Sequence, residues 1–259
     1  MRGVINPWVT IEPENIYLMD CLEGMTYIAD GSIDLIATDL PYAMTNNQWD
    51  SLIPFDQLWT AYKRILKPTG AVVLTGIQPF TSALVMSNPK WFRCEWIWEK
   101  EQGTGFLNCH KYPLRSHESV LVFAAGKHTY NPQMVPGKPY TSRNKGRPST
   151  NYRPDLIRTP TINETGDRYP KTVLRFKRDK HKLHPTQKPV ALFAYLIKTY
   201  SNPGGVVLDS CIGSGTTCVS AIQTGRRYLG FETDPGYFKT AQQRIAEATQ
   251  EHATLDTLF

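Results

Sequence analysis

Four acidic residues stand where apolar runs of the sequence end. Asp20 follows IYLM, Asp39 follows IDLIAT, Asp209 follows VVL, and Glu232 closes RYLGF. In open parallel sheets ligands bind outside the carboxyl ends of the strands, so acids at these ends are candidates for ligand contact. In TDLPY (38–42), an acid followed by proline and tyrosine is also an ordinary capped turn, and these letters alone do not decide between turn and site.

A second motif, VVLDSCIGSGTT (206–217), places two glycines between an apolar run and a helical pattern. Glycines there let the backbone turn tightly and let a ligand approach the free N–H groups of the next helix. A phosphate-binding P-loop needs lysine after the last glycine, where Thr216 stands, and a dinucleotide fingerprint needs a third glycine, where Cys218 stands. Both phosphate-binding readings therefore fail.

The loop begins instead with the carboxylate of Asp209, which suits a cationic ligand end such as an amino group or a sulfonium. Glu232 closes the next apolar run, seventeen residues after Gly215, at the position where an acid usually binds the hydroxyls of a ribose. A nucleoside with a positively charged amino-acid tail meets both requirements. The pattern predicts S-adenosylmethionine as the cofactor.

An internal segment carries the excess positive charge of the chain. The net charge is +6, and residues 127–182 hold 14 Lys and Arg against 4 Asp and Glu. The segment also contains tyrosines and seven prolines, with little apolar periodicity. A solvated, partly disordered loop would have this composition. Basic charge interleaved with aromatic rings also suits phosphate contact and base stacking, and we favour nucleic acid as its partner.

The elements that must position these motifs alternate along the chain. Strands are predicted at 15–20, 32–39, 70–76, 92–100, 118–126, 205–210 and 226–232, and helices at 55–67, 79–88, 188–201, 215–225 and 235–250. Near-continuous apolar strands alternating with helices predict an α/β fold with a doubly wound, mostly parallel sheet of the Rossmann-like type. No strong helix separates 92–100 from 118–126, so these two can form an antiparallel pair at one edge.

Composition sets the class of protein. The chain has 259 residues, 41% of them hydrophobic, which is ample for a core. Its apolar runs are too short to span a bilayer and its first residues do not form a signal peptide, so we expect a cytoplasmic protein. Five scattered cysteines without a C-x-x-C pair argue against a disulfide framework and a zinc site, and we predict no metal.

Taken together, the motifs resemble those of the amino-group DNA methyltransferases of the circularly permuted β class. TDLPY resembles the catalytic D-P-P-Y motif, and VLDSCIGSGTT resembles the D-P-F-x-G-S-G-T-T cofactor loop. HPTQKP (184–189) matches H-P-x-x-K-P, YLMDCLEGM resembles the segment that meets the cofactor's adenine, and GFETDPGYFKTAQQRI resembles the ribose strand and its helix. Two departures stand out: Leu40 replaces the first proline, and Cys211–Ile212 replace the usual phenylalanine and its neighbour.

The resemblance implies one methyltransferase domain interrupted by a target-recognition insertion. Residues 1–126 would form its catalytic lobe, 127–183 the basic insertion and 184–259 the cofactor-binding lobe. DNA would be the partner, with Arg143, Lys145, Arg147, Arg153 and Arg158 as candidate contacts. A homodimer and a cognate restriction endonuclease that does not associate stably are further partners that the resemblance allows.

The same resemblance assigns the site residues. Asp39 and the backbone carbonyl of Leu40 would accept the protons of an exocyclic amine, while Pro41 fixes the approach of Tyr42, which stacks on a flipped base. Lys188 would meet the carboxylate of the cofactor. The remaining predicted cofactor contacts are Asp20, Cys21, Asp39, Asp209, Ser210, Cys211, Gly213, Ser214, Gly215, Thr216 and Glu232.

Adenine N6 is the expected target, because family members with Asp at the first position of the catalytic motif mostly modify adenine. Cytosine N4 and an amino group of RNA are the alternatives within the same chemistry. A non-catalytic DNA-binding module is the alternative from another class, and the intact Asp39, Tyr42 and Glu232 argue against it.

Overall fold

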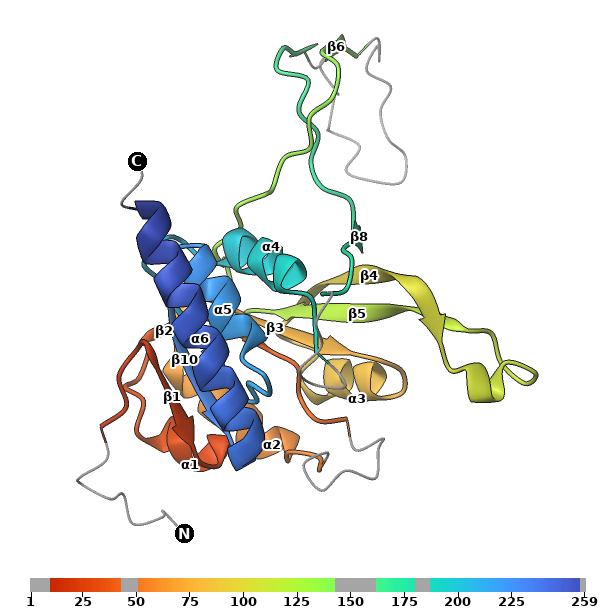
Figure 1. Ribbon diagram of the computed structural model, residues 1–259. Coiled ribbons are helices and arrows are strands. Elements are labelled where there is room, and N and C mark those ends of the chain that lie inside the picture. Colours follow the sequence, from red (N-terminus) through yellow and green to blue (C-terminus); the bar gives the residue numbers. More distant parts are fainter. Residues whose placement is uncertain (1–9, 43–50, 143–161, 180–186, 257–259) are drawn as a thin grey trace. The chain divides into compact units, whose positions relative to one another are not determined.

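A computed structural model describes residues 10–42, 51–142, 162–179 and 187–256 (Figure 1). The chain divides into a main unit, residues 1–131 with 172–259, and an inserted unit, residues 132–171. The inserted unit lies within the predicted insertion 127–183, and both ends of that insertion belong to the main unit. Within the described ranges, no helix is long and apolar enough to cross a membrane.

An eight-stranded sheet forms the centre of the main unit. Its strands lie in the order β1 (Asn15–Leu18), β10 (Arg227–Glu232), β9 (Val206–Asp209), β2 (Ile33–Thr38), β3 (Leu66–Gly76), β5 (Arg115–Phe123), β4 (Phe92–Thr104) and β8 (Val173–Arg175). The pairs from β1 to β3 are all parallel, whereas β5 is antiparallel to both β3 and β4. The predicted α/β fold with a mostly parallel sheet and an antiparallel pair is therefore confirmed.

One strand of this sheet was not predicted. β8 pairs in parallel with β4, so β4 and β5 are not the edge of the sheet. The strand has three residues, of which only Leu174 is buried, and so few residues show no periodic pattern. The short helix α1 (Cys21–Thr26) was missed for the same reason.

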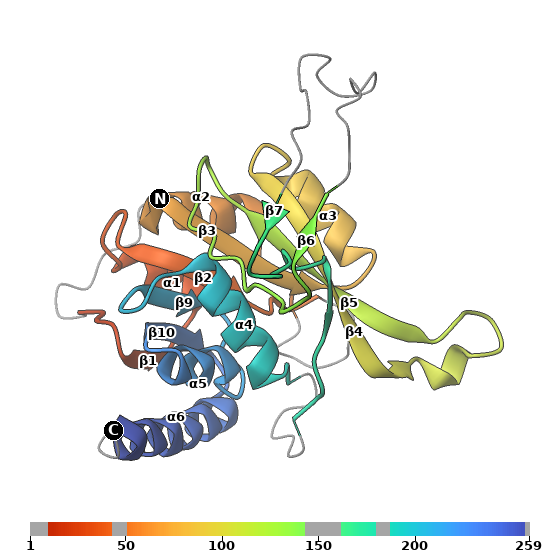
Figure 2. The same cartoon turned by 90° about the horizontal axis from the view of Figure 1, so that it is seen from above.

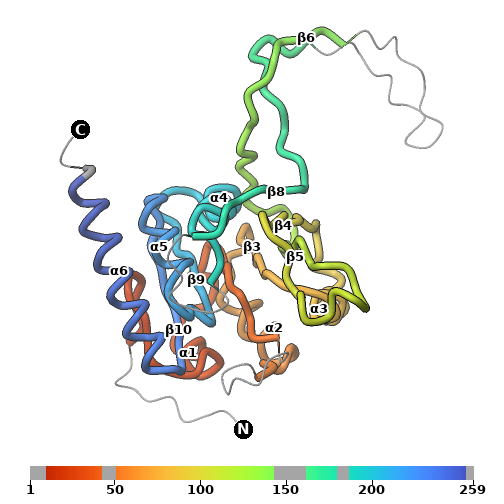
Figure 3. The backbone as a smooth tube through the Cα atoms, turned by 45° about the vertical axis from the view of Figure 1, so that its right-hand side comes forward, coloured from red at the N-terminus to blue at the C-terminus, as the bar shows by residue number. Residues whose placement is uncertain are grey.

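Helices cover both faces of the sheet, which explains why its central strands are almost continuously apolar. Figure 2 shows α2 (Phe55–Ile65) and α3 (Phe80–Ser87) on one side, and α4 (Val190–Tyr200), α5 (Thr216–Gln223) and α6 (Pro235–Asp256) on the other. In β2, Ile36 packs into the core beneath α2, whereas Leu35 and Ala37 pack into the core beneath α4. α6 lies beside α5 near the β1 edge (Figure 3).

Amphipathic spacing explains how these helices dock. In α2 the buried side chains are Leu58, Trp59, Tyr62 and Ile65, which fall on one face of a helix with 3.6 residues per turn. Their burial fixes the position of the strand that follows, β3, which supplies Thr75 to the site described below.

The inserted unit contains a two-stranded antiparallel sheet, β6 (Tyr140–Thr141) and β7 (Ile162–Asn163). A further bridge joins Val135 to Arg168. The guanidinium group of Arg168 lies 4.4 Å from the centre of the Tyr140 ring and donates a hydrogen bond to the carbonyl of Lys138 at 2.6 Å. The predicted DNA contacts Arg143, Lys145, Arg147, Arg153 and Arg158 lie outside the described residues.

Candidate active site

A cavity of about 550 Å³ opens at the carboxyl ends of the central strands. Along the chain β2 leads to β3 on one side, and β9 leads to β10 on the other, so the strand order reverses between β2 and β9. Such a reversal separates the loops that follow the two strands and leaves room for a ligand between them. The loop after β2 carries Asp39, and the loop after β9 begins at Asp209.

Nearly all the predicted site residues of the described chain line this one cavity. The predicted catalytic residues there are Asp39, Leu40, Pro41 and Tyr42, and the predicted cofactor contacts there are Asp20, Cys21, Lys188, Asp209, Ser210, Cys211, Gly213, Ser214, Thr216 and Glu232. Gly215 does not line it. Residues that are far apart in sequence are therefore brought together, as the positions of their strand ends require.

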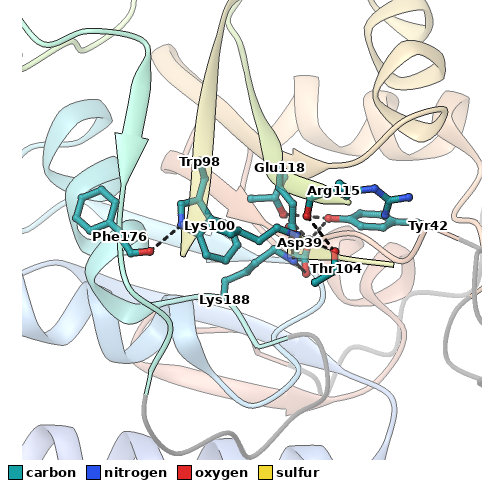
Figure 4. Close-up of polar contacts among 10 residues, drawn as sticks. Asp39, Tyr42, Trp98, Lys100, Thr104, Arg115, Glu118, Phe176 and Lys188 are labelled. Atoms are coloured by element: carbon teal, nitrogen blue, oxygen red, sulfur yellow. Dashed lines mark hydrogen bonds and ion pairs between the residues drawn. The ribbon is translucent and has the colours of Figure 1, made fainter. Parts of the chain in front are cut away.

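Three donors converge on the carboxylate of Asp39 (Figure 4). The hydroxyl groups of Tyr42 and Thr75 donate to Oδ1, and the ammonium group of Lys188 donates to Oδ2. An ionised carboxylate offers about four acceptor positions, so about one remains for a ligand. The three donors also fix the direction of that position, because they come from the catalytic loop itself, from β3 and from the segment before α4.

A line of alternating charges continues inward from Asp39. Lys188 Nζ lies 3.4 Å from Glu118 Oε2, and Glu118 Oε1 lies 3.0 Å from Lys100 Nζ. Burial disfavours the charge of Lys188, but the neighbouring Asp39, Tyr42 and Glu118 raise its pKa above the ordinary value. Burial alone would raise the pKa of Glu118, yet the two lysines hold it below its usual range. Charges at these buried positions are stable because each faces an opposite charge.

Tyr42 contributes both its ring and its hydroxyl group. The ring packs against Phe80, with the centroids 4.8 Å apart, and Lys188 Nζ lies 5.8 Å from the ring centre. Burial, and then the charge of Asp39, raise the pKa of Tyr42 well above its ordinary value. The hydroxyl group therefore stays protonated and acts as a donor to Asp39.

Leu40 is a core residue. Its side chain is 3% exposed and packs in the apolar cluster that also contains Ile36 and Phe80. A buried side chain restrains the backbone of the loop, which is what the ring of a proline would do by fixing φ. This gives a physical reason for leucine at a position where the family motif has proline.

The glycine loop is held by the acids at its two sides. Asp209 Oδ1 accepts the N–H of Cys211 at 2.9 Å, and Glu232 Oε2 accepts the N–H of Gly213 at 2.8 Å. Burial raises the pKa of Asp209 to about 6, against hydrogen bonds from Thr217 and Thr38 that lower it. Burial also raises the pKa of Glu232. Both acids thus line the cavity and shape the loop.

Gly215 serves the helix that follows rather than the cavity. Its φ is +81°, a left-handed conformation that glycine adopts without strain, and a Cβ there would lie 3.1 Å from Cβ of Ala241 on α6. The residue lets α5 begin against α6. The predicted role of Gly215 in cofactor contact therefore stays a prediction.

At the β1 side of the cavity, a helix cap shapes the segment between β1 and α1, and a pair of thiols lies beside it. Asp20 Oδ1 accepts the N–H groups of Leu22 at 2.8 Å and Glu23 at 3.1 Å, which caps α1. A hydrogen bond with the thiol of Cys21, and then burial, raise the pKa of Cys211. The thiols of Cys21 and Cys211 therefore meet at this end of the cavity.

Sequence reasoning missed Glu118, Lys100, Thr75 and Arg115, which all stand near the catalytic loop. Lys100, Glu118 and Arg115 line the cavity, and Thr75 bonds to Asp39. A signal for Lys100 exists, because Trp96, Trp98 and Lys100 alternate along β4 and the two tryptophans are buried. A lysine at the next inward-facing position of such a strand is expected to be buried, and a buried lysine needs an acidic partner.

Comparison with known proteins gives a family match and similar individual proteins. A family model described as DNA methylase, for the N6 and N4 enzymes, matches residues 33–243. Over 260 residues the chain is 26% identical to the type II methyltransferase M2.MboI of Moraxella bovis, a match covering 91% of this chain and 88% of that protein. A stretch of 90 residues is 43% identical to YubD of Escherichia coli (strain K12), covering 34% of this chain and 40% of that protein.

Among solved structures, the M1.HpyAVI–SAM complex superimposes with a TM-score of 0.62 at 24% identity. The match covers 89% of this chain and 98% of that one. At this level of identity the likeness establishes the fold.

Proposed function

The chain belongs to the N6/N4 DNA methylase family, and we propose that it methylates the N6 amine of a flipped adenine in DNA, with S-adenosylmethionine as the methyl donor. The arrangement at Asp39 carries the proposal. Its carboxylate has about one acceptor position left and stands in the cavity that also contains the glycine loop and Glu232.

The residues of the cavity suit the cofactor. A volume of about 550 Å³ is in the range of small-molecule sites, and two buried acids stand where a ribose and a cationic tail need acceptors. We assign Glu232 to the ribose, Asp20 and Cys21 to the adenine end, and residues 209–217 to the methionine end. When bound there, the cofactor supplies a methyl group on a positively charged sulfur.

Asp39 and the carbonyl of Leu40 would act on the amine of the target base. The lone pair of this amine is delocalised into the ring, so the nitrogen is a poor nucleophile. Two acceptors that take its N–H hydrogen bonds draw the nitrogen toward a tetrahedral shape and localise the lone pair. The carboxylate also favours the positive charge that develops on the nitrogen during attack.

Lys188 would set the orientation of Asp39. The ammonium group of Lys188 is buried, donates to Oδ2 of Asp39 and also pairs with Glu118. Rotation of the Asp39 carboxylate would therefore break a buried ion pair. The earlier prediction for Lys188, contact with the carboxylate of the cofactor, stays a prediction.

Tyr42 and Pro41 would receive the base. The target atom lies inside a duplex, so the nucleotide must turn out of the stack into the cavity. The Tyr42 ring is held on one side by Phe80 and at its hydroxyl group by Asp39, which makes it a rigid stacking surface.

The inserted unit would supply DNA contacts. Its described part presents Lys138, Arg168 and exposed tyrosines, and the sequence between the described residues adds Arg143, Lys145, Arg147, Arg153 and Arg158. Positive charge of this density favours binding to phosphates. We further infer that the chain can form a homodimer and that a cognate restriction endonuclease would act without stable association.

Expression in a host that lacks its own DNA methylation, followed by mapping of modified bases, tests the proposal. N6-methyladenine at one recurring sequence is expected, and the Asp39→Ala variant should give none. Finding N4-methylcytosine instead would show that the target base is cytosine. Finding no modified base in the DNA would contradict the proposal.

A further inference from the structure

The hairpin between β4 and β5 ends in exposed apolar side chains. Phe106 is 67% exposed, Leu107 100% and Tyr112 69%. Figure 1 shows that this hairpin projects away from the rest of the sheet. Large apolar groups gathered at one exposed tip are a feature of surfaces that meet a partner.

The tip has a defined backbone. Gly105 has φ of +95°, and the 3₁₀ turn η1 (Phe106–Asn108) follows it. The N–H of Asn108 bonds to the carbonyl of Gly105 at 3.0 Å, and the N–H groups of Lys111 and Tyr112 both bond to the carbonyl of Asn108 at 2.9 Å. The apolar side chains are therefore presented by a closed turn.

The base of the hairpin belongs to the active site. Thr104 and Arg115 line the cavity, and Thr104 Oγ1 donates to the carbonyl of Arg115 at 3.2 Å. Lys100 Nζ lies 3.5 Å from Thr104 Oγ1 and 3.0 Å from Glu118, which joins the hairpin to the charged line behind Asp39 (Figure 4). Leu107 follows Thr104 by three residues. Three residues of extended chain span at most about 11 Å, so the tip lies within that distance of Thr104 at the cavity wall.

Charge identifies the partner. Residues 102–117 contain Lys111, Arg115, His110 and His117 and no acidic residue. An apolar tip on a positively charged hairpin suits a partner with negative charge on its surface and stacked apolar groups inside it. Duplex DNA has phosphates at its surface and stacked bases in its interior.

We propose that Phe106 and Leu107 form a wedge that enters the DNA stack where the target base has left it. This inference rests on the proposed function, because a wedge is needed only if a base is flipped. Turning a base out of a duplex sacrifices its stacking and pairing, and apolar side chains inserted between base steps restore part of the lost contact. The wedge keeps the gap filled while the base occupies the cavity.

The experiment compares two DNA substrates with the full-length protein. One is a duplex containing the site found by methylation mapping, and the other carries an abasic position opposite the target base, which leaves that base unpaired. The F106A/L107A variant should lose about 10- to 100-fold in kcat/KM on the duplex and no more than about threefold on the abasic substrate. A Met86→Ala variant is the control, because Met86 is 72% exposed on α3 and does not line the cavity.

A second readout follows flipping directly. With 2-aminopurine at the target position, the wild type should raise the fluorescence on binding and the double variant should not. Equal losses on both substrates, or no loss on either, would overturn the wedge. A change in oligomeric state in the double variant, measured by sedimentation, would make the tip a contact between copies and would also overturn it. A wild type inactive on both substrates would instead remove the proposed function.

Discussion

The ammonium group of Lys188 bonds to the carboxylate of Asp39, although 149 residues separate them in sequence. The bond joins the loop after β2 to the segment before α4. The carboxylate proposed to be catalytic is therefore held by the part of the chain that also forms the glycine loop, and the proposed site is complete only when both parts have folded together.

Replacing Asp39 tests the amine clamp. Asp39→Asn keeps the shape of the side chain but removes a charged acceptor, so kcat should fall at least about 100-fold in a methyl-transfer assay. Asp30→Asn is the matched control, because Asp30 is an exposed acid that forms an ion pair with Arg64 at the surface. Activity of Asp39→Asn close to that of the wild type would contradict the clamp.

Two variants of Tyr42 separate the ring from the hydroxyl group. Tyr42→Phe keeps the stacking surface and loses the hydrogen bond to Asp39, whereas Tyr42→Ala loses both. We expect a loss of kcat/KM within about tenfold for Phe and about 10- to 100-fold beyond that for Ala, since base stacking on an aromatic ring contributes about 1–3 kcal/mol. Equal losses in the two variants would show that the ring does not stack on the base.

Lys188→Met should lower the free energy of unfolding by about 3 kcal/mol, because it leaves the half-buried Asp39 and Glu118 without their shared cation. Urea unfolding at neutral pH measures this change. Adding Glu118→Gln should recover part of the loss. The pKa of Glu118 lies below its ordinary value, so its stabilising contribution is present at neutral pH and is lost as the pH falls through the folded-state pKa.

Lys177→Met is the control for this pair, because Lys177 is 3.9 Å from Glu101 and its side chain is 86% exposed. Its effect should be below about 1 kcal/mol. A loss in Lys188→Met no larger than in this control would show that the buried line of charges does not stabilise the fold.

Asp209 gives a pH dependence of the opposite sign. Its pKa is raised from an ordinary 3.8 to about 6, so between these values the folded state binds a proton that the unfolded state does not. The free energy of unfolding should therefore gain a contribution as the pH falls from about 6 to 4, at most about 3 kcal/mol. Unfolding of wild type and Asp209→Asn at pH 7.5 and pH 5 isolates it. The same difference between the two pH values in both proteins would contradict the assignment.

The parts of the site that could be predicted are those whose pattern is local. Asp39, Asp209 and Glu232 each end an apolar strand, and the glycines after Asp209 mark the turn into a helix. These features can be recognised from the residues immediately before and after them in the sequence. For that reason the α/β fold and most of the cavity wall followed from the sequence.

The parts that could not be predicted depend on pairings across the sheet. Glu118 meets Lys100 because β4 and β5 pair antiparallel in a register that sets Trp98 opposite Glu118. Thr75 reaches Asp39 because β3 lies beside β2. No neighbouring letters encode these registers, and three residues such as those of β8 are too few to form a periodic pattern.

The residues that flank the inserted unit, Asn131 and Thr172, are both hydrogen-bonded within the main unit. The N–H of Asn131 bonds to the carbonyl of Thr199 at 2.7 Å at the end of α4, and the carbonyl of Thr172 accepts the N–H of Ile97 on β4 at 2.8 Å. The sequence between these two flanking residues can therefore change without altering either hydrogen bond. If this segment sets the DNA sequence that the enzyme prefers, as the proposed function implies, a lineage could exchange it while every residue around Asp39 stays the same.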